Sequence, residues 1–286
     1  MTPRRLDIPV LSTHGFSRMA TWLWEPEGQA GGRDVLCLHG LTRNGRDFEP
    51  LARRLAEAGR RVCCPDIVGR GESEWLANPA DYVVPTYLPH AAALLPALGV
   101  EEVDWVGTSM GGLMGIILAG VPNSPIRRLV INDIGPFVPK EALQDLSDTI
   151  SQPMAWPDWD TAEAAVRTRC ASFGLKTDED WKRLTEISVK PDGAGGYRAN
   201  FDLGIIAPFA GLAPMDVDLW AYWDQITCPV LVLRGADSTL FPPQVAAEMA
   251  QRGPQTRIVE VPDCGHAPML WDPDQIAPIV AFLQEG

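Results

Sequence analysis

The sequence predicts an α/β fold: a mostly parallel, doubly wound sheet with an inserted helical lid. Three observations predict it. Short continuous apolar runs alternate with helical patterns, as expected where strands are buried on both faces of a parallel sheet. One of these runs ends in a serine flanked by glycines and is followed by an apolar helix. The alternation stops between residues 136 and 226 and then resumes.

The first half of the chain supplies most of the sheet. Residues 5–25 contain two segments rich in strand formers, which predict a strand pair. Glycines close the first two helices. Alternation of this kind places ligands at the carboxyl ends of the strands. Buried strands are expected at 34–38, 61–66, 102–106 and 127–131, and helices at 48–58, at 85–98 and directly after the serine.

The segment from 136 to 226 shows helical patches and no buried-strand pattern. Five of the ten tryptophans lie in it, which favours a helical cap with an aromatic underside, although most of these rings need only pack the cap itself. We therefore expect an α/β core in two parts, 1–135 and 227–286, and a helical lid of residues 136–226. The expected cap helices are 141–150, 161–173, 177–189 and 217–223, and the core then adds strands at 229–233 and 257–261 and helices at 243–251 and 273–283.

Composition restricts the class of partner. A formal net charge of -13 excludes nucleic acid and anionic membranes, which attract clustered positive charge, and favours an uncharged or weakly charged small molecule. The chain has no apolar run of membrane-spanning length and no apolar segment behind its first basic residues, so we expect a cytoplasmic protein. The six cysteines lack metal-ligand spacing, and neither a metal nor a cofactor is expected. The sequence sets no oligomeric state.

The candidate chemistry centres on Ser109. Its flanking glycines, with a strand before and a helix after, predict a nucleophile elbow whose strained backbone exposes the hydroxyl. Serine needs an adjacent base, and the base needs an orienting acid. Of the four histidines, His266 in the loop after the last strand is the candidate base. His14 lies in the first hairpin, His90 in a helix and His39 in a glycine turn.

Two aspartates qualify as the orienting acid. Asp237 ends the strand before the one that precedes His266, and it is the first choice. Asp133 follows the strand after the elbow helix, and it is the alternative. Both keep the chain order serine, acid, histidine.

Five motifs stand in a fixed order along the chain. They are Leu38-His39-Gly40-Leu41, Asp66-x-x-Gly69-x-Gly71-x-Ser73, Gly107-Thr-Ser109-Met-Gly111-Gly112, Gly235-Ala-Asp237 and Gly265-His266-x-Pro268. In these motifs the chain resembles the α/β-hydrolase superfamily over essentially its whole length. The resemblance implies that Ser109 is the nucleophile, that His266 is the base and then the acid, and that Asp237 orients it. It also implies an oxyanion hole formed by the backbone N–H groups of Leu41 and Met110, and a lid between the sixth and seventh strands.

The resemblance also narrows the reaction. Relatives that open epoxides or displace halide carry aspartate at the elbow, where this chain has Ser109. We expect a serine carboxylesterase that cleaves small or medium esters with an apolar part through an acyl-enzyme. The alternatives are a lactonase and a carbon-carbon hydrolase of ring-cleavage products, in which Arg43, Arg198 or Arg234 would bind a substrate carboxylate. A ligand sensor built on the hydrolase fold is the alternative of another class.

Overall fold

The computed structural model describes residues 1–28, 31–150, 152, 154–209 and 215–285. An eight-stranded sheet runs through the molecule in the order β1-β2-β4-β3-β5-β6-β12-β13. Strands β4 to β13 of this order are parallel, while β1 and β2 pair antiparallel at one edge. The predicted fold class is confirmed. The strands are β1 Arg4–Ser12, β2 Gly15–Trp24, β3 Asp34–Leu38, β4 Val62–Pro65, β5 Val103–Thr108, β6 Ile126–Asn132, β12 Val230–Gly235 and β13 Thr256–Val261.

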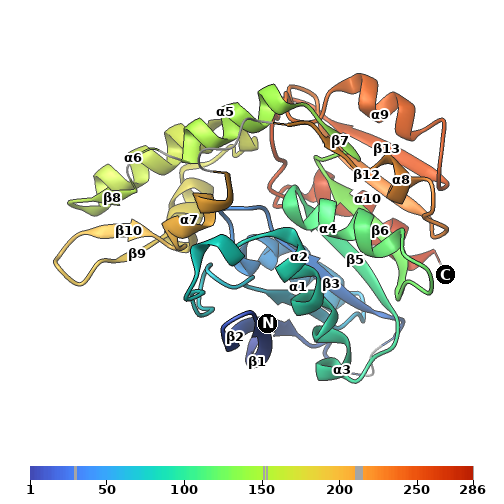
Figure 1. Cartoon of the computed structure of the whole chain (residues 1–286), viewed down its shortest axis with the longest axis horizontal. Helices are drawn as coiled ribbons and strands as arrows, with labels where there is room; N and C mark the ends of the chain where they lie inside the picture. The colour runs from blue at the N-terminus through green and yellow to red at the C-terminus, as the bar shows by residue number, and fades with distance from the viewer. Residues whose placement is uncertain (29–30, 151, 153, 210–214, 286) are drawn as a thin grey trace.

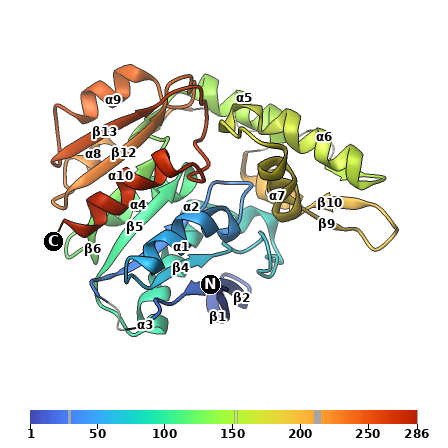
Figure 2. The same cartoon turned by 180° about the vertical axis from the view of Figure 1, so that it is seen from behind.

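Helices cover both faces of the sheet (Figures 1 and 2). Helices α1 and α10 share one core with the sheet, and α2, α4 and α9 belong to the core on the other face. Within β3, Val35 and Cys37 face the first core and Leu36 and Leu38 face the second. This explains the unbroken apolar runs in the sequence. The helices are α1 Glu49–Glu57, α2 Val84–Ala92, α3 Leu94–Leu98, α4 Met110–Ala119, α8 Trp220–Trp223, α9 Pro243–Met249 and α10 Pro273–Gln284.

One predicted helix is divided in two. The sequence suggested a continuous helix over 85–98, but α2 ends at Ala92 and α3 begins at Leu94. Pro96 has no N–H to donate to the carbonyl of Ala92, so the helical ladder is interrupted there.

The segment between β6 and β12 is mainly helical, with short strands that the sequence analysis missed. Helices α5 (Lys140–Ile150), α6 (Trp159–Arg169) and α7 (Asp178–Ser188) match the expected patches. The expected absence of strands is wrong, because two small sheets form, in the orders β8-β10-β9 and β11-β7. Their strands have only two or three residues, too few for a period to show. They are β7 Phe137–Val138, β8 Ala155–Trp156, β9 Val189–Pro191, β10 Tyr197–Ala199 and β11 Val217–Asp218.

Hydrogen bonds join this inserted segment to the sheet loops, although most of it gathers on one side of the molecule (Figure 1). The N–H of Asp202 donates to the carbonyl of Gly69 at 2.7 Å, and the Tyr82 hydroxyl donates to the Asp202 carboxylate at 2.7 Å. Asn44 donates to the carbonyl of Ile187 at 2.7 Å. Residues 151, 153 and 210–214 of the expected lid lie outside the described part.

Across the described ranges, no helix is both long enough and apolar enough to traverse a bilayer.

A glycine substitution in the elbow tests its packing. A Cβ on Gly111 would lie 2.0 Å from the carbonyl oxygen of Leu38, a backbone atom that cannot rotate away. Gly111→Ala should lower the free energy of unfolding by about 3 kcal/mol or more in urea denaturation, despite the better helix propensity of alanine. Gly31→Ala is the control, since a Cβ there meets nothing within 4 Å. Equal stability of the two variants would contradict this packing.

Candidate active site

Ser109 stands at a sharp turn between β5 and α4. Its φ of 51° and ψ of -114° lie in a region that non-glycine residues seldom occupy. The Ser109 N–H donates to the carbonyl of Asn132 at 3.0 Å, while its own carbonyl accepts from the first turn of α4. A Cβ on Gly107 would lie 2.2 Å from the carbonyl oxygen of Gly111. Only glycine therefore lets the strand and helix approach this closely.

The Ser109 hydroxyl is the end of a hydrogen-bonded chain of three side chains. His266 Nε2 lies 2.9 Å from Ser109 Oγ, and His266 Nδ1 lies 2.8 Å from Asp133 Oδ2. The Asp133 carboxylate is buried and also accepts the N–H of Gly235 at 2.8 Å through Oδ1. These contacts fix the imidazole with Nδ1 protonated and Nε2 free to accept the serine proton.

The expectation that Asp237 holds His266 is wrong, because Asp133 makes that contact. The order of strands explains the difference. Strand β6, which Asp133 directly follows, lies beside β5, whereas β12 lies one strand farther away. The loop after β13 crosses the end of β12 to reach Ser109. His266 therefore lies at the end of β6, next to Asp133. Asp237 is exposed, and its backbone N–H donates to the carbonyl of Cys264 at 2.9 Å.

The crossing of this loop depends on Gly235 and on the inserted segment. A Cβ on Gly235 would lie 2.3 Å from the carbonyl oxygen of Gly265, so a side chain there would block the crossing. Ser172 holds the loop from the other side. Its hydroxyl donates to the carbonyl of His266 at 2.9 Å, and its carbonyl accepts the N–H of Gly265 at 2.7 Å.

The turn after β3 approaches the serine from the opposite side. A Cβ on Gly40 would lie 3.6 Å from Ser109 Cβ. His39 Nε2 accepts the N–H of Ile67 at 2.9 Å, which places its proton on Nδ1, 2.7 Å from the carbonyl oxygen of Gly40. Burial lowers the pKa of His39 to about 3, so this histidine is a neutral support for the turn. Arg70 Nε donates to the carbonyl of Leu41 at 2.9 Å.

The other two histidines lie away from Ser109, as expected. His90 is buried in α2, where Nε2 lies 3.0 Å from the carbonyl oxygen of Leu11. His14 is exposed in the β1–β2 turn, 3.8 Å from Asp81.

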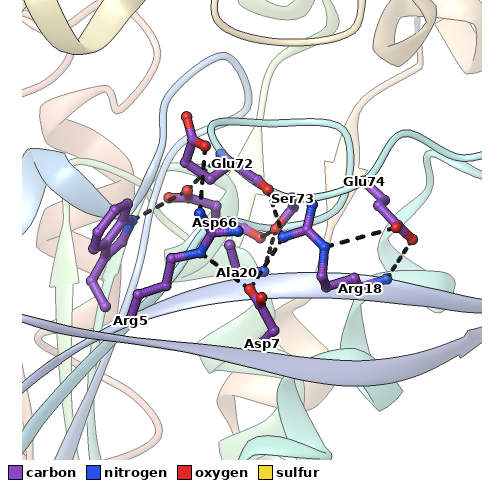
Figure 3. A network of polar contacts seen from close by, with 9 residues as sticks. Arg5, Asp7, Arg18, Ala20, Asp66, Glu72, Ser73 and Glu74 are labelled. Atoms are coloured by element: carbon purple, nitrogen blue, oxygen red, sulfur yellow. Dashed lines mark hydrogen bonds and ion pairs between the residues drawn. The ribbon is translucent and has the colours of Figure 1, made fainter.

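A buried carboxylate organises the loop beside this turn (Figure 3). Asp66 accepts the N–H of Gly45 at 2.7 Å, the N–H of Glu72 at 2.9 Å and the indole N–H of Trp22 at 3.2 Å. A Cβ on Gly71 would lie 2.3 Å from Asp66 Oδ2, which explains that glycine in the motif. Burial raises the pKa of Asp66 to about 6, although its hydrogen bonds act in the opposite direction.

A cavity of about 250 Å³ opens above the serine. Apolar side chains form most of its wall, as in typical small-molecule sites. The sheet loops contribute Gly40, Leu41, Ser109, Leu240 and Met269, and the inserted segment contributes Ile150, Trp156, Val166, Phe173, Ala199 and Phe201.

Arg43 reaches the cavity with its charge neutralised. It makes two hydrogen bonds to the Asp47 carboxylate, at 2.8 and 2.6 Å, and a third to Ser188 at 2.6 Å. Burial alone would lower its pKa, but Asp47 outweighs burial and raises it. Arg198, which lies over the Trp75 ring, and Arg234, which pairs with Glu260, do not line the cavity. In the described part of the chain, no cluster of three or more His, Cys, Asp or Glu is placed to bind a metal.

Comparison with known proteins identifies the family. The profile of the alpha/beta hydrolase fold matches residues 35–273. The chain belongs to the α/β-hydrolase family.

Similar proteins cover between 79% and 99% of this α/β-hydrolase. It is 42% identical to the 3-hydroxybutyrate-oligomer hydrolase of Cupriavidus necator, over 96% of both chains. It is 28% identical to the 2-hydroxymuconate semialdehyde hydrolase of Pseudomonas putida, over 79% of this chain and 78% of that one. The crystal structure of an alpha/beta hydrolase from Novosphingobium aromaticivorans superposes with a TM-score of 0.87, at 36% identity over 99% of both chains.

One cavity residue of this α/β-hydrolase was missed by the sequence analysis. Arg169, the last residue of α6, lines the cavity. The signal was present, because Ala162, Val166 and Arg169 follow helical spacing and share one face. An arginine continuing an apolar helix face indicates a cation that points inward.

Replacement of each aspartate by asparagine tests which one orients His266. Asp133→Asn should lower kcat on any accepted ester by roughly 1,000- to 10,000-fold, because an amide holds the imidazole in the wrong tautomer. Asp237→Asn should stay within about threefold of the unmodified enzyme, since its side chain is exposed. The measurement is kcat of both variants by steady-state kinetics. A large loss of kcat in Asp237→Asn together with a nearly unchanged kcat in Asp133→Asn would reverse the assignment.

The raised pKa of Asp66 predicts a pH dependence of stability. The folded protein holds this proton more tightly than the unfolded chain, whose carboxyl has the ordinary pKa of 3.8. The wild type should therefore lose stability relative to Asp66→Asn as pH rises from 5 to 7.5, by roughly 1 to 2 kcal/mol. Urea unfolding of both proteins across this range measures the difference. A wild type whose stability stays constant or rises relative to that of Asp66→Asn as pH increases would refute the shift.

Proposed function

We propose that Ser109, His266 and Asp133 form a catalytic triad that hydrolyses esters through an acyl-enzyme. The observation that carries this proposal is the hydrogen-bonded chain from Ser109 to Asp133 at the floor of the cavity. His266 takes the proton of Ser109 as Oγ attacks the ester carbonyl, and then gives it to the departing alcohol. Asp133 stabilises the imidazolium. Water activated by His266 releases the acid and restores Ser109.

The oxyanion of each tetrahedral intermediate is assigned to the backbone N–H groups of Leu41 and Met110. Met110 is the first residue of α4, where helical N–H groups have no partner within the helix. The close approach of Gly40 to Ser109 and the bond from Arg70 to the Leu41 carbonyl support this role for the turn. Fixed donors of this kind stabilise the charge that develops in acyl transfer.

The substrate class is a short ester of hydroxy acids, such as a 3-hydroxybutyrate oligomer. The similarity to the Cupriavidus necator hydrolase supports it, and such oligomers fit the expectation of a small or medium ester with an apolar part. The cavity volume of about 250 Å³ is small among ligand pockets, which span about 300–1,000 Å³. A site of this size suits short oligomers.

Residues 136–226 serve as the lid in this proposal. The segment builds one wall of the cavity and also holds the His266 loop through Ser172. Substrate that enters beneath it is sheltered from bulk water, which strengthens the electrostatic interactions at the reacting centre.

A carbon-carbon hydrolase is the second candidate, supported by the similarity to the Pseudomonas putida enzyme. Of the three arginines considered for its substrate carboxylate, only Arg43 lines the cavity, and Asp47 neutralises it. The arginines do not decide between the two functions, because Arg169 also lines the cavity. The ester function is preferred because the identity to the Cupriavidus necator hydrolase is higher, 42% against 28%. A dienoate keto acid that exceeds the 3-hydroxybutyrate dimer in kcat/KM would reverse this preference.

Serine replacement tests the proposed chemistry. Ser109→Ala should lower kcat on a 3-hydroxybutyrate trimer by about 100,000-fold or more, since the nucleophile is lost. The measurement is release of monomer and dimer by chromatography. Unchanged urea unfolding of the variant is the control for folding, and turnover retained by a folded variant would remove Ser109 from the mechanism.

A further inference from the structure

Arg169 is a cation at the cavity wall that the proposed chemistry leaves unused. It ends helix α6 and lines the cavity together with Trp156 and Cys170. Its guanidinium lies 5.8 Å from the centroid of the Trp156 ring. A cation held against an aromatic face is restricted in orientation, while its N–H groups stay available to a ligand.

The helix geometry turns Arg169 inward. Ala162 and Val166 are buried, and Arg169 follows them at the spacing that keeps residues on one helix face. Arg167 points to another side of the same helix. There it pairs with Glu163 at 2.8 Å and with Asp178 at 2.9 Å. Two arginines of one helix thus have different surroundings, one ion-paired near the surface and one at the cavity.

Among the described residues, Arg169 has no carboxylate as an ion-pair partner. Throughout the described residues, no Asp or Glu lies within 4.0 Å of its guanidinium, and none of the positions outside them is Asp or Glu. Asp145 lines the same cavity and has an interaction of its own. Burial accordingly lowers the pKa of Arg169. The guanidinium stays charged, since free arginine titrates above about pH 12.

A half-buried cation without a counter-charge is costly unless an anion binds to it. The Arg43 guanidinium is poorly suited to this purpose, because Asp47 neutralises its charge and each of its three nitrogens already donates to Asp47 or Ser188. Arg169 is therefore the cavity side chain suited to an anionic substrate group. The planar guanidinium matches a carboxylate, to which it donates two parallel hydrogen bonds.

We propose that Arg169 binds the free carboxylate at the end of a hydroxy-acid oligoester, which rests on the ester function proposed above. In such an oligomer the units are joined head to tail, so the free carboxylate lies on the alcohol side of every ester bond. Arg169 thus holds the leaving unit while Ser109 takes the acyl part. The enzyme then prefers the ester bond close to the carboxyl end, and it prefers acids to their neutral esters.

Comparison of a charged and a neutral substrate tests this role. The probes are the 3-hydroxybutyrate dimer as free acid and as methyl ester. The unmodified enzyme should favour the acid in kcat/KM. Arg169→Met should lower kcat/KM for the acid by about 10- to 100-fold, mainly through KM, and leave the methyl ester within about threefold. Arg169→Lys should recover part of the preference.

Arg167→Met is the matched control, since it removes an arginine of the same helix that is ion-paired away from the cavity. It should leave the ratio of acid to methyl ester unchanged. Retained turnover of the methyl ester shows that each variant is folded. An Arg169→Met variant that loses both substrates equally, or keeps the wild-type ratio, overturns the inference alone. A wild type that hydrolyses neither dimer overturns the ester function itself.

Discussion

The crossing of the His266 loop over the end of β12 is the constraint on which the site depends. Ser109 follows β5 and Asp133 follows β6, so these two side chains are neighbours by virtue of the sheet alone. His266 follows β13 and must be carried back across β12. Gly235 permits that crossing, and its N–H is bound by Asp133. Gly235 therefore has two functions: it leaves room for the His266 loop, and its N–H donates a hydrogen bond that positions the Asp133 carboxylate.

Charge in and around the cavity is arranged in two ways. Arg43 and Asp47 neutralise each other within the wall, and Asp66 is enclosed by N–H donors beneath the neighbouring turn. These groups stabilise loops through contacts within the protein. Arg169 differs, since an aromatic ring is its contact in place of a carboxylate. Its charge is available for recognition because the protein does not neutralise it.

The inserted segment has a double role in this arrangement. It brings Trp156 and Arg169 to the cavity, and through Ser172 it fixes the backbone of the loop that carries His266. Binding in the cavity and the position of the base are thus connected through one part of the chain. A change in the packing of this segment would therefore alter both the shape of the cavity and the position of His266. The Ser109 turn, in contrast, is positioned by the sheet and α4.

The sequence by itself determined the parallel sheet and the strand-to-helix turn at Ser109, and it selected His266 as the histidine near that serine. These follow from local patterns: buried strands, glycine spacing and a loop at a strand end. It did not determine the acid, because Asp133 and Asp237 both end strands at the same edge, and chain order suits either. The order of strands in the sheet places Asp133 beside His266, because β6 is the neighbour of β5 and β12 is one strand farther away. Tertiary structure also decided the surroundings of Arg169. Among the described residues no carboxylate forms an ion pair with it, and the sequence of its helix does not show this.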